Sequence, residues 1–279
     1  MPNYYTHLHF GTAVLAALPA ALAERLAGER QAFELGCLGP DVLFFHHPLL
    51  PGRVNREGHS MHRASALPAA ERLRRAVEEG LPMARGYAAG FFCHLALDSA
   101  CHGCVDAMAA RGEATHLAIE AELDRALMVE DGFPMVDHRA HMPRVEEAAV
   151  WTAAARAYAE ASPRQVEAAF RTMERLAALL ARTCGRRRGR LLDLAALLVP
   201  PARGMRGIAL RAEPDPLCAA HGLRLRAIMG EAVAPAAAEI TGFFRSVAQN
   251  APLSPWFDRD FKGRVLPPAE GAVMGPVRA

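Results

Sequence analysis

The chain has 279 residues, of which 52% are hydrophobic and 22% are charged, and its formal net charge at pH 7 is +2. This composition is typical of a globular protein with a sizeable core and argues against a disordered chain. The small net charge argues against binding driven by bulk charge, so we expect no stable nucleic-acid partner. The length predicts one large domain, or one domain with an appendage.

Cysteine content and the first apolar stretch both favour a cytoplasmic protein. Six cysteines in 279 residues are too few for a disulfide framework. Cys101 and Cys104 have CxxC spacing, but the sequence has no second pair that would complete a structural zinc site. The stretch from Phe10 to Ala23 resembles a signal-peptide core, yet no Lys or Arg precedes it and Pro19 interrupts it. We therefore expect a retained helix.

Helical periodicity dominates the sequence. The pattern predicts a first helix from His7 to about Ala17, which continues after Pro19 to about Ala27. The apolar residues 31–39 run into a turn, and residues 41–65 have the irregular pattern of a long loop. Further helices are predicted over about residues 65–79, 83–101, 116–129, 143–160, 163–183 and 218–249, and residues 191–199 are a candidate for one more.

The sequence contains no alternating apolar run with a hairpin turn, so we predict an all-α fold. Residues 1–250 are expected to form a single multi-helix domain. Residues 251–279 are rich in Pro and Gly and predict an extended C-terminal tail. An arginine cluster at residues 182–190 is interpreted as a solvated connector, with an anion-attracting patch as the alternative.

Histidines concentrate in the first 141 residues of the chain, where eleven of the twelve occur. His94, Asp98 and His102 are spaced four residues apart along a predicted helix, so their side chains share one face and can converge on one point. That helix is apolar almost all round, and an ionised Asp98 is costly there unless it is paired, hydrogen-bonded or bound to metal. His116 and Glu120 repeat the spacing at the start of the next predicted helix.

Imidazole nitrogens together with carboxylate oxygens are the ligands of zinc and of harder divalent metals. Five such ligands exceed what one tetrahedral zinc uses, so the pattern favours a multinuclear site. Two metals close together suit phosphoryl chemistry, because both can stabilise charge on the attacking and leaving oxygens. For either motif alone, a buried His–Asp hydrogen bond or a surface pair is the alternative.

Five short motifs occur in order within residues 1–130, namely Thr6-His7-Leu8-His9-Phe10-Gly11, Gly39-Pro40-Asp41, Met61-His62, the segment from His94 to His102, and Thr115-His116-Leu117-Ala118-Ile119-Glu120. Together they resemble the zinc-dependent phospholipase C family, which is related to the helical P1 nuclease type. The resemblance is closest to an uncharacterised bacterial branch whose members lack signal peptides.

The resemblance implies an all-α domain that holds two or three zinc ions and hydrolyses phosphodiester bonds with a hydroxide formed on the zinc cluster. By position it implies eight metal ligands: His7, Asp41, His62, His94, Asp98, His102, His116 and Glu120. Asp98 would bridge two metals. Asp41 would also act as the catalytic general base, which fits an irregular, solvent-reachable loop. The implied substrates are phospholipid head groups or small phosphoesters, with transient contact to a membrane surface.

The family pattern is not complete in this sequence. Secreted members use a processed N-terminal Trp as a metal ligand, whereas this chain begins Met1-Pro2-Asn3, so the number and identity of the metals stay open. A nuclease or phosphatase on the same site is one alternative function, and a non-catalytic helical protein with structural metal is another. His59 is the alternative to His62 as a ligand. We expect ordinary surface or capping roles for three further histidines, His138, His141 and His221.

Overall fold

The computed structural model describes residues 4–48, 50, 52–112, 114–133, 141–181, 189, 191, 193–194, 198 and 207–266. Within these residues the regular structure is helical, apart from an isolated β-bridge between Arg259 and Val265, so the predicted all-α fold is confirmed. The arginine cluster, most of the candidate helix at 191–199, His138 and residues 267–279 lie outside the described residues. None of the described helices combines the length and the apolar character that a membrane crossing needs.

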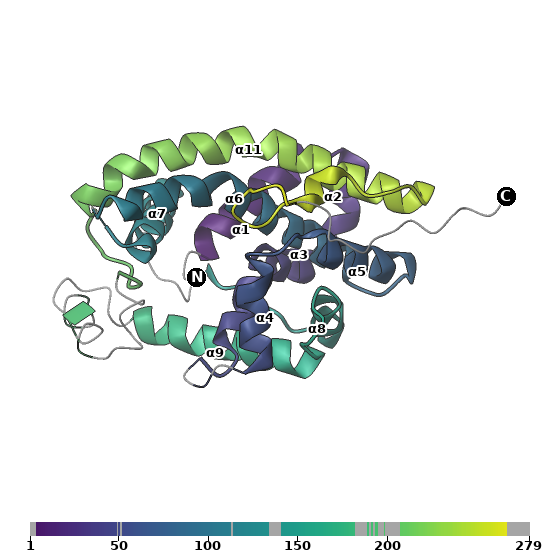
Figure 1. The fold of residues 1–279 in the computed structure, drawn as a ribbon, viewed down its shortest axis with the longest axis horizontal. Coiled ribbons are helices and arrows are strands. Elements are labelled where there is room, and N and C mark those ends of the chain that lie inside the picture. Colours follow the sequence, from purple (N-terminus) through teal and green to yellow (C-terminus); the bar gives the residue numbers. More distant parts are fainter. Residues whose placement is uncertain are drawn as a thin grey trace.

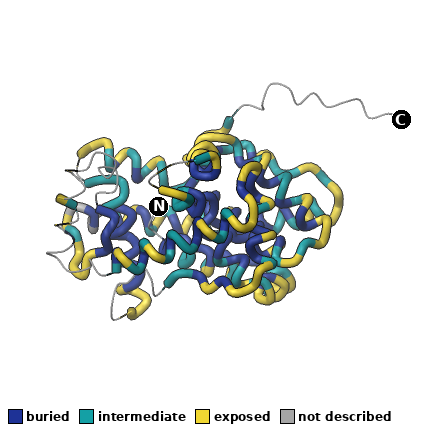
Figure 2. The backbone as a smooth tube through the Cα atoms, turned by 90° about the horizontal axis from the view of Figure 1, so that it is seen from below, coloured by how far each residue is buried: buried dark blue, intermediate teal, exposed yellow. Residues whose placement is uncertain are grey.

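The described elements follow one another along the chain as α1 (Tyr4–Ala17), α2 (Ala20–Ala27), α3 (Arg30–Cys37), the 3-10 helix η1 (Gly39–Phe45), α4 (Arg53–Met61), α5 (Leu67–Glu78), α6 (Ala84–Ala110), α7 (His116–Glu130), α8 (Ala148–Ala155), α9 (Pro163–Ala181), α11 (Pro216–Gln249) and the 3-10 helix η4 (Pro255–Asp258). Figure 1 shows α11 along one long edge of the molecule and α9 along the opposite edge. Buried residues gather in the interior of the molecule, and exposed residues lie along its outer surface (Figure 2).

The central helix is α6, which packs against α3 and α11 and contacts α1 and α7. Two glycines let α3 and α6 approach closely. A Cβ atom on Gly90 would lie 2.0 Å from the carbonyl oxygen of Phe33, and one on Gly36 would lie 2.4 Å from that of Tyr87. Because the backbones are this close, the Cys37 carbonyl at the end of α3 comes within 3.1 Å of the His94 ring.

The predicted loop over residues 41–65 differs from the structure, which has η1 and α4 in this region. Helix α4 is polar, and it is anchored by tertiary contacts rather than by an apolar stripe. Val54 and Asn55 are buried, and Asn55 Nδ2 donates a 2.7 Å hydrogen bond to the Phe44 carbonyl. Asp41 therefore lies on a helical turn and is only 4% exposed, so the expected solvent-reachable loop position is wrong.

Residues 251–266, predicted as the first part of an extended tail, fold back onto the helices. Phe257 and Phe261 are buried, and the Ser65 hydroxyl and the Ala66 amide donate to backbone carbonyls of this segment. The segment has one turn of 3-10 helix and otherwise irregular backbone. Long-range contacts rather than local periodicity hold it, and the domain boundary at residue 250 stays a prediction.

Candidate metal centre

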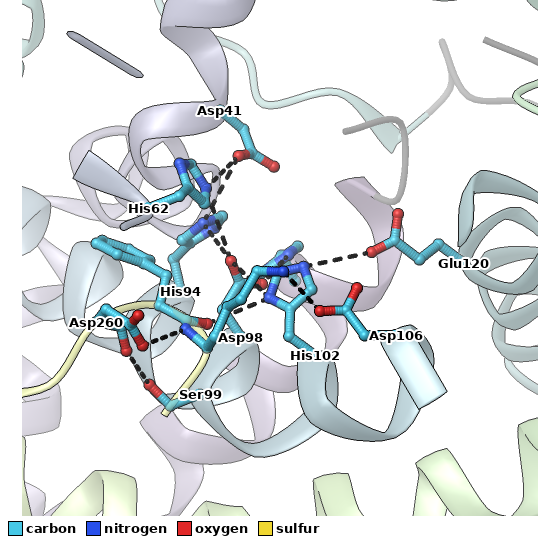
Figure 3. Close-up of polar contacts among 12 residues, drawn as sticks. Asp41, His62, His94, Asp98, Ser99, His102, Asp106, Glu120 and Asp260 are labelled. Carbon is cyan, nitrogen blue, oxygen red and sulfur yellow. Dashed lines mark hydrogen bonds and ion pairs between the residues drawn. The ribbon is translucent and has the colours of Figure 1, made fainter. Parts of the chain in front are cut away.

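Segments far apart in the sequence bring eight side chains together in the core (Figure 3). They come from α1, η1, the residue that ends α4, and helices α6 and α7. They are the side chains of all eight residues predicted as ligands, namely His7, Asp41, His62, His94, Asp98, His102, His116 and Glu120. No other described histidine belongs to a group of three potential ligands.

Asp98 lies at the centre of the cluster. Its Oδ1 atom is 3.4 Å from Nε2 of His7, whose ring stacks on that of His94 with centroids 4.2 Å apart. Its Oδ2 atom is 3.3 Å from Nε2 of His94 and 3.4 Å from Nδ1 of His102. The Nε2 atom of His62 lies 3.8 Å from the same oxygen. One carboxylate therefore faces four imidazole rings, as a bridging ligand would.

Two further carboxylates lie on either side of Asp98. The Oδ1 atom of Asp41 is 2.9 Å from Nε2 of His62 and 4.0 Å from Nε2 of His94. The Oε1 atom of Glu120 is 3.0 Å from Nε2 of His116 and 3.8 Å from Nε2 of His102. The ligand atoms form three groups, each within 4.8 Å: His7, Asp41 and His94; His62, His94 and Asp98; and His102, His116 and Glu120.

The Nδ1 ring nitrogens of four of the histidines are held by hydrogen bonds. A carbonyl oxygen can only accept, so an Nδ1 atom that faces one carries the proton and leaves the Nε2 lone pair for a metal. The Nδ1 to carbonyl distances are 2.7 Å for His62 and Gly58, 3.1 Å for His94 and Cys37, and 3.2 Å for His102 and Phe261. In His116 the Nδ1 atom lies 3.1 Å from Oδ1 of Asp106.

Some polar atoms of the cluster make no hydrogen bond of full geometry. The Nε2 atoms of His62 and His94 and the Oε2 atom of Glu120 are buried in this way, although carboxylate oxygens of Asp41 and Asp98 lie 2.9 Å and 3.3 Å from the two nitrogens. A buried unsatisfied polar atom costs about 1–3 kcal/mol, and three in one cluster call for a ligand that satisfies them together. A divalent cation would do so. The nitrogen and oxygen donors fit zinc or a harder metal, so the residues present fit the predicted zinc.

Burial and the neighbouring charges set the protonation of the central residues. Burial, reinforced by the nearby His94 ring, lowers the pKa of His7 to about 3. His7 is therefore neutral at pH 7, the form that can bind a metal. Burial raises the pKa of Asp98, but the His102 and His94 rings outweigh it and hold that pKa below its usual range. A neutral imidazole and an ionised carboxylate are the forms that a cation needs.

Three of the other histidines have different surroundings. His59 stacks on Phe44 with ring centroids 4.3 Å apart, and it belongs to none of the three groups. His9 lies on a different face of α1 from His7, and its Nδ1 atom is 2.9 Å from Oδ2 of Asp131. The ring of His141 packs against Tyr5 at 4.8 Å.

Several residues around the cluster escaped the sequence analysis. Asp106 follows His102 by four residues and Asp124 follows Glu120 by four, so continuing the helical spacing by one turn would have found both. Phe261 and Lys262 carried no comparable motif signal, because they contact the cluster from the opposite end of the chain.

An all-α domain built around buried groups of imidazoles and carboxylates has the architecture of a zinc hydrolase. The chain belongs to the zinc-dependent phospholipase C family, whose family model matches residues 6–184, more than half of its length. The match includes all eight residues of the cluster and stops before α11. No significant match was found among the curated proteins or among the solved structures.

Proposed function

We propose that the protein is a phospholipase C-like hydrolase that cleaves phosphodiester bonds in phospholipids or smaller phosphoesters, with zinc held by the eight clustered residues. The observation that carries this proposal is the set of buried imidazole and carboxylate atoms that face one another around Asp98 with incomplete hydrogen bonding. Two or three zinc ions, when bound, lower the pKa of a water to about 7 and stabilise negative charge on phosphate oxygens.

The side chains have separate roles in this proposal. His62 and His94 would hold a metal together with Asp41, whose Oδ1 atom lies 2.9 Å from Nε2 of His62. His102, His116 and Glu120 would hold another, and Asp98, which also contacts His7, would be shared between the two groups. Asp41 accepts the proton of the attacking water as general base. The buried position of these groups excludes bulk water, which strengthens their electrostatic effect on the phosphate.

A second function, that of a helical protein with purely structural metal, is favoured by one observation. The cavity that touches His7, Asp98, His102 and Glu120 has a volume of about 20 Å³. That is room for about one water molecule. Structural sites are closed, whereas catalytic sites keep an open coordination position. Substrate must therefore reach the cluster through movement of side chains, or the metal serves only the fold.

Metal content and hydrolysis assays on the same preparation distinguish the two functions. Elemental analysis should find two or three zinc ions per chain. The protein should hydrolyse a chromogenic phosphodiester and release a phosphorylated head group from phospholipid vesicles. Zinc without hydrolysis would favour the structural role, and a protein without tightly bound divalent metal would refute both.

Two matched variants test the assignment of residues. Asp98→Asn removes the charge that faces four imidazoles, so it should lose zinc and reduce hydrolysis at least about 100-fold. Asp131→Asn makes the same change outside the three groups, where Asp131 accepts hydrogen bonds from Tyr5 and His9, and should keep both zinc and activity. Equal effects of the two variants would contradict the assignment.

A further inference from the structure

The C-terminal segment, residues 254–266, reaches the metal centre from a part of the chain outside the family match, which ends at residue 184. Phe261 in this segment is 1% exposed, and its ring lies 4.9 Å from that of His62 and 5.7 Å from that of His94. The segment therefore forms one wall of the cluster.

The conformation of the C-terminal segment is fixed by a buried carboxylate. Asp260 is fully buried, and it accepts hydrogen bonds from the Lys262 amide at 2.9 Å, the Arg264 amide at 2.9 Å and Nε of Arg264 at 2.8 Å. The Ser99 hydroxyl donates to the Asp260 carbonyl at 3.3 Å (Figure 3). Ser99 directly follows Asp98 on α6, so the turn is attached next to the centre of the cluster.

Gly263 allows this turn to lie against α6. Its φ angle is +76°, in the left-handed region that favours glycine, and a Cβ atom there would lie 2.4 Å from the Ser99 carbonyl oxygen. A larger residue would push the turn away from the helix. The position of the neighbouring Phe261 and Lys262 thus depends on this close approach.

The first contact with a proposed ligand is made by backbone. The Phe261 carbonyl lies 3.2 Å from Nδ1 of His102. Because the carbonyl only accepts, it keeps the proton on Nδ1 and leaves the lone pair on Nε2, which faces Oε1 of Glu120 at 3.8 Å.

The second contact runs through two side chains. Nζ of Lys262, the only lysine in the sequence, lies 2.6 Å from Oδ2 of Asp106. The other oxygen of Asp106 lies 3.1 Å from Nδ1 of His116, whose Nε2 is 3.0 Å from Glu120. A carboxylate that accepts from Nδ1 orients the ring and makes its other nitrogen a stronger donor to metal. Lys262 in turn holds that carboxylate in place.

We infer that the C-terminal segment is a positioning element of the metal centre, in which the Phe261 carbonyl sets the tautomer of His102 and Lys262, through Asp106, orients His116. The inference rests on the proposed role of these histidines as ligands. Both contacts act on the group of His102, His116 and Glu120. Loss of such supporting contacts typically weakens metal binding about 10–100-fold.

Zinc affinity of Lys262 variants in the full chain tests the inference. Lys262→Met should weaken one zinc site about 10–100-fold, measured by competition with a chromophoric chelator, and leave the remaining zinc unchanged. Lys262→Arg keeps the charge and should retain most of the affinity. The control is Arg30→Met, which removes a cation from the exposed Arg30–Glu34 ion pair on α3 and should bind zinc as the unmodified chain does.

Each outcome decides a different question. The Lys262–Asp106 pair is partly exposed, with side chains 42% and 40% accessible, so Lys262→Met should unfold at nearly the same denaturant concentration as Arg30→Met when chelator is present. Equal zinc affinity in these two variants would overturn the inference and leave the proposed function standing. The inference would also be overturned if Lys262→Met were less stable than Arg30→Met and bound zinc more weakly at every site. An unmodified chain that binds no zinc would instead remove the proposed function.

Discussion

Asp124 provides a test of how burial controls charge next to the metal centre. It is fully buried on α7, and its Oδ1 atom accepts hydrogen bonds from the amide of Thr6 at 2.8 Å and the hydroxyl of Thr6 at 2.5 Å. Burial raises the pKa of Asp124 from 3.8 to about 8, although the Thr6 hydrogen bonds act in the opposite direction. The carboxyl is therefore mainly protonated in the folded protein at pH 7, and it anchors the helix that carries His7.

The variant Asp124→Asn keeps the shape and the acceptor atom but cannot ionise. Between pH 3.8 and about 8 the folded protein holds a proton at Asp124 that the unfolded chain releases, so the stability of the unmodified protein falls as pH rises. The slope is about 1.4 kcal/mol per pH unit over an interval of about four units, which gives a total of about 6 kcal/mol as an order of magnitude. The amide of Asp124→Asn binds no proton in either state, so the variant does not lose this stability as pH rises.

The assay is urea unfolding of both proteins from pH 4 to pH 9 in the presence of chelator, so that metal loading is equal. The variant should match the unmodified protein near pH 4, become more stable as pH rises, and reach a constant difference above pH 8. Asp131→Asn is the control. Burial raises the pKa of Asp131, but the hydrogen bonds from Tyr5 and His9 outweigh burial and lower that pKa overall. The ionised carboxylate therefore stabilises the folded state, and Asp131→Asn should be less stable than the unmodified protein above about pH 4. A pH-independent difference for Asp124→Asn would refute the reasoning.

Two further predictions concern the C-terminal turn and the bound metal. Gly263→Ala should destabilise the protein by about 1–3 kcal/mol in urea unfolding, because φ is +76° there and a Cβ would meet the Ser99 carbonyl. Gly242→Ala on α11, where a Cβ would meet nothing within 4 Å, should stabilise it by about 0.5–1 kcal/mol, and the opposite ranking would contradict this account. Zinc at 100 times its Kd should raise the unfolding free energy by about 2.7 kcal/mol per site. In a thermal scan the unfolding midpoint should therefore rise with zinc and fall again with chelator. An unfolding midpoint that zinc leaves unchanged would argue against binding to the folded state.

The central part of the candidate site could be predicted because it obeys local helical spacing. His94, Asp98 and His102 occupy successive turns of α6, and their convergence follows from that periodicity alone. The convergence of this helix with Asp41 and His7 does not follow from spacing. It was implied by the ordered family motifs, and the packing of α1 and η1 on α6 brings these residues together. Their roles as ligands stay a prediction, as does a cytoplasmic location.

Features that depend on distant contacts could not be predicted. Helix α4 lacks an apolar stripe, and its buried Asn55 is satisfied by a carbonyl of η1. The prolines and glycines of the C-terminal segment indicate a tail, but Phe257 and Phe261 are buried against helices more than 150 residues away in sequence, such as α6. No local pattern in the sequence encodes the contact between Lys262 and Asp106.

The contacts of the cluster join residues near the beginning of the chain to residues near its end, from His7 to Lys262. During synthesis on the ribosome, the segment that contacts His102 and Asp106 emerges after every proposed ligand. The histidine cluster therefore has its full set of supports only after translation has passed the C-terminal segment. A chain cut short after α11 would carry every proposed ligand and still lack the wall that orients two of them.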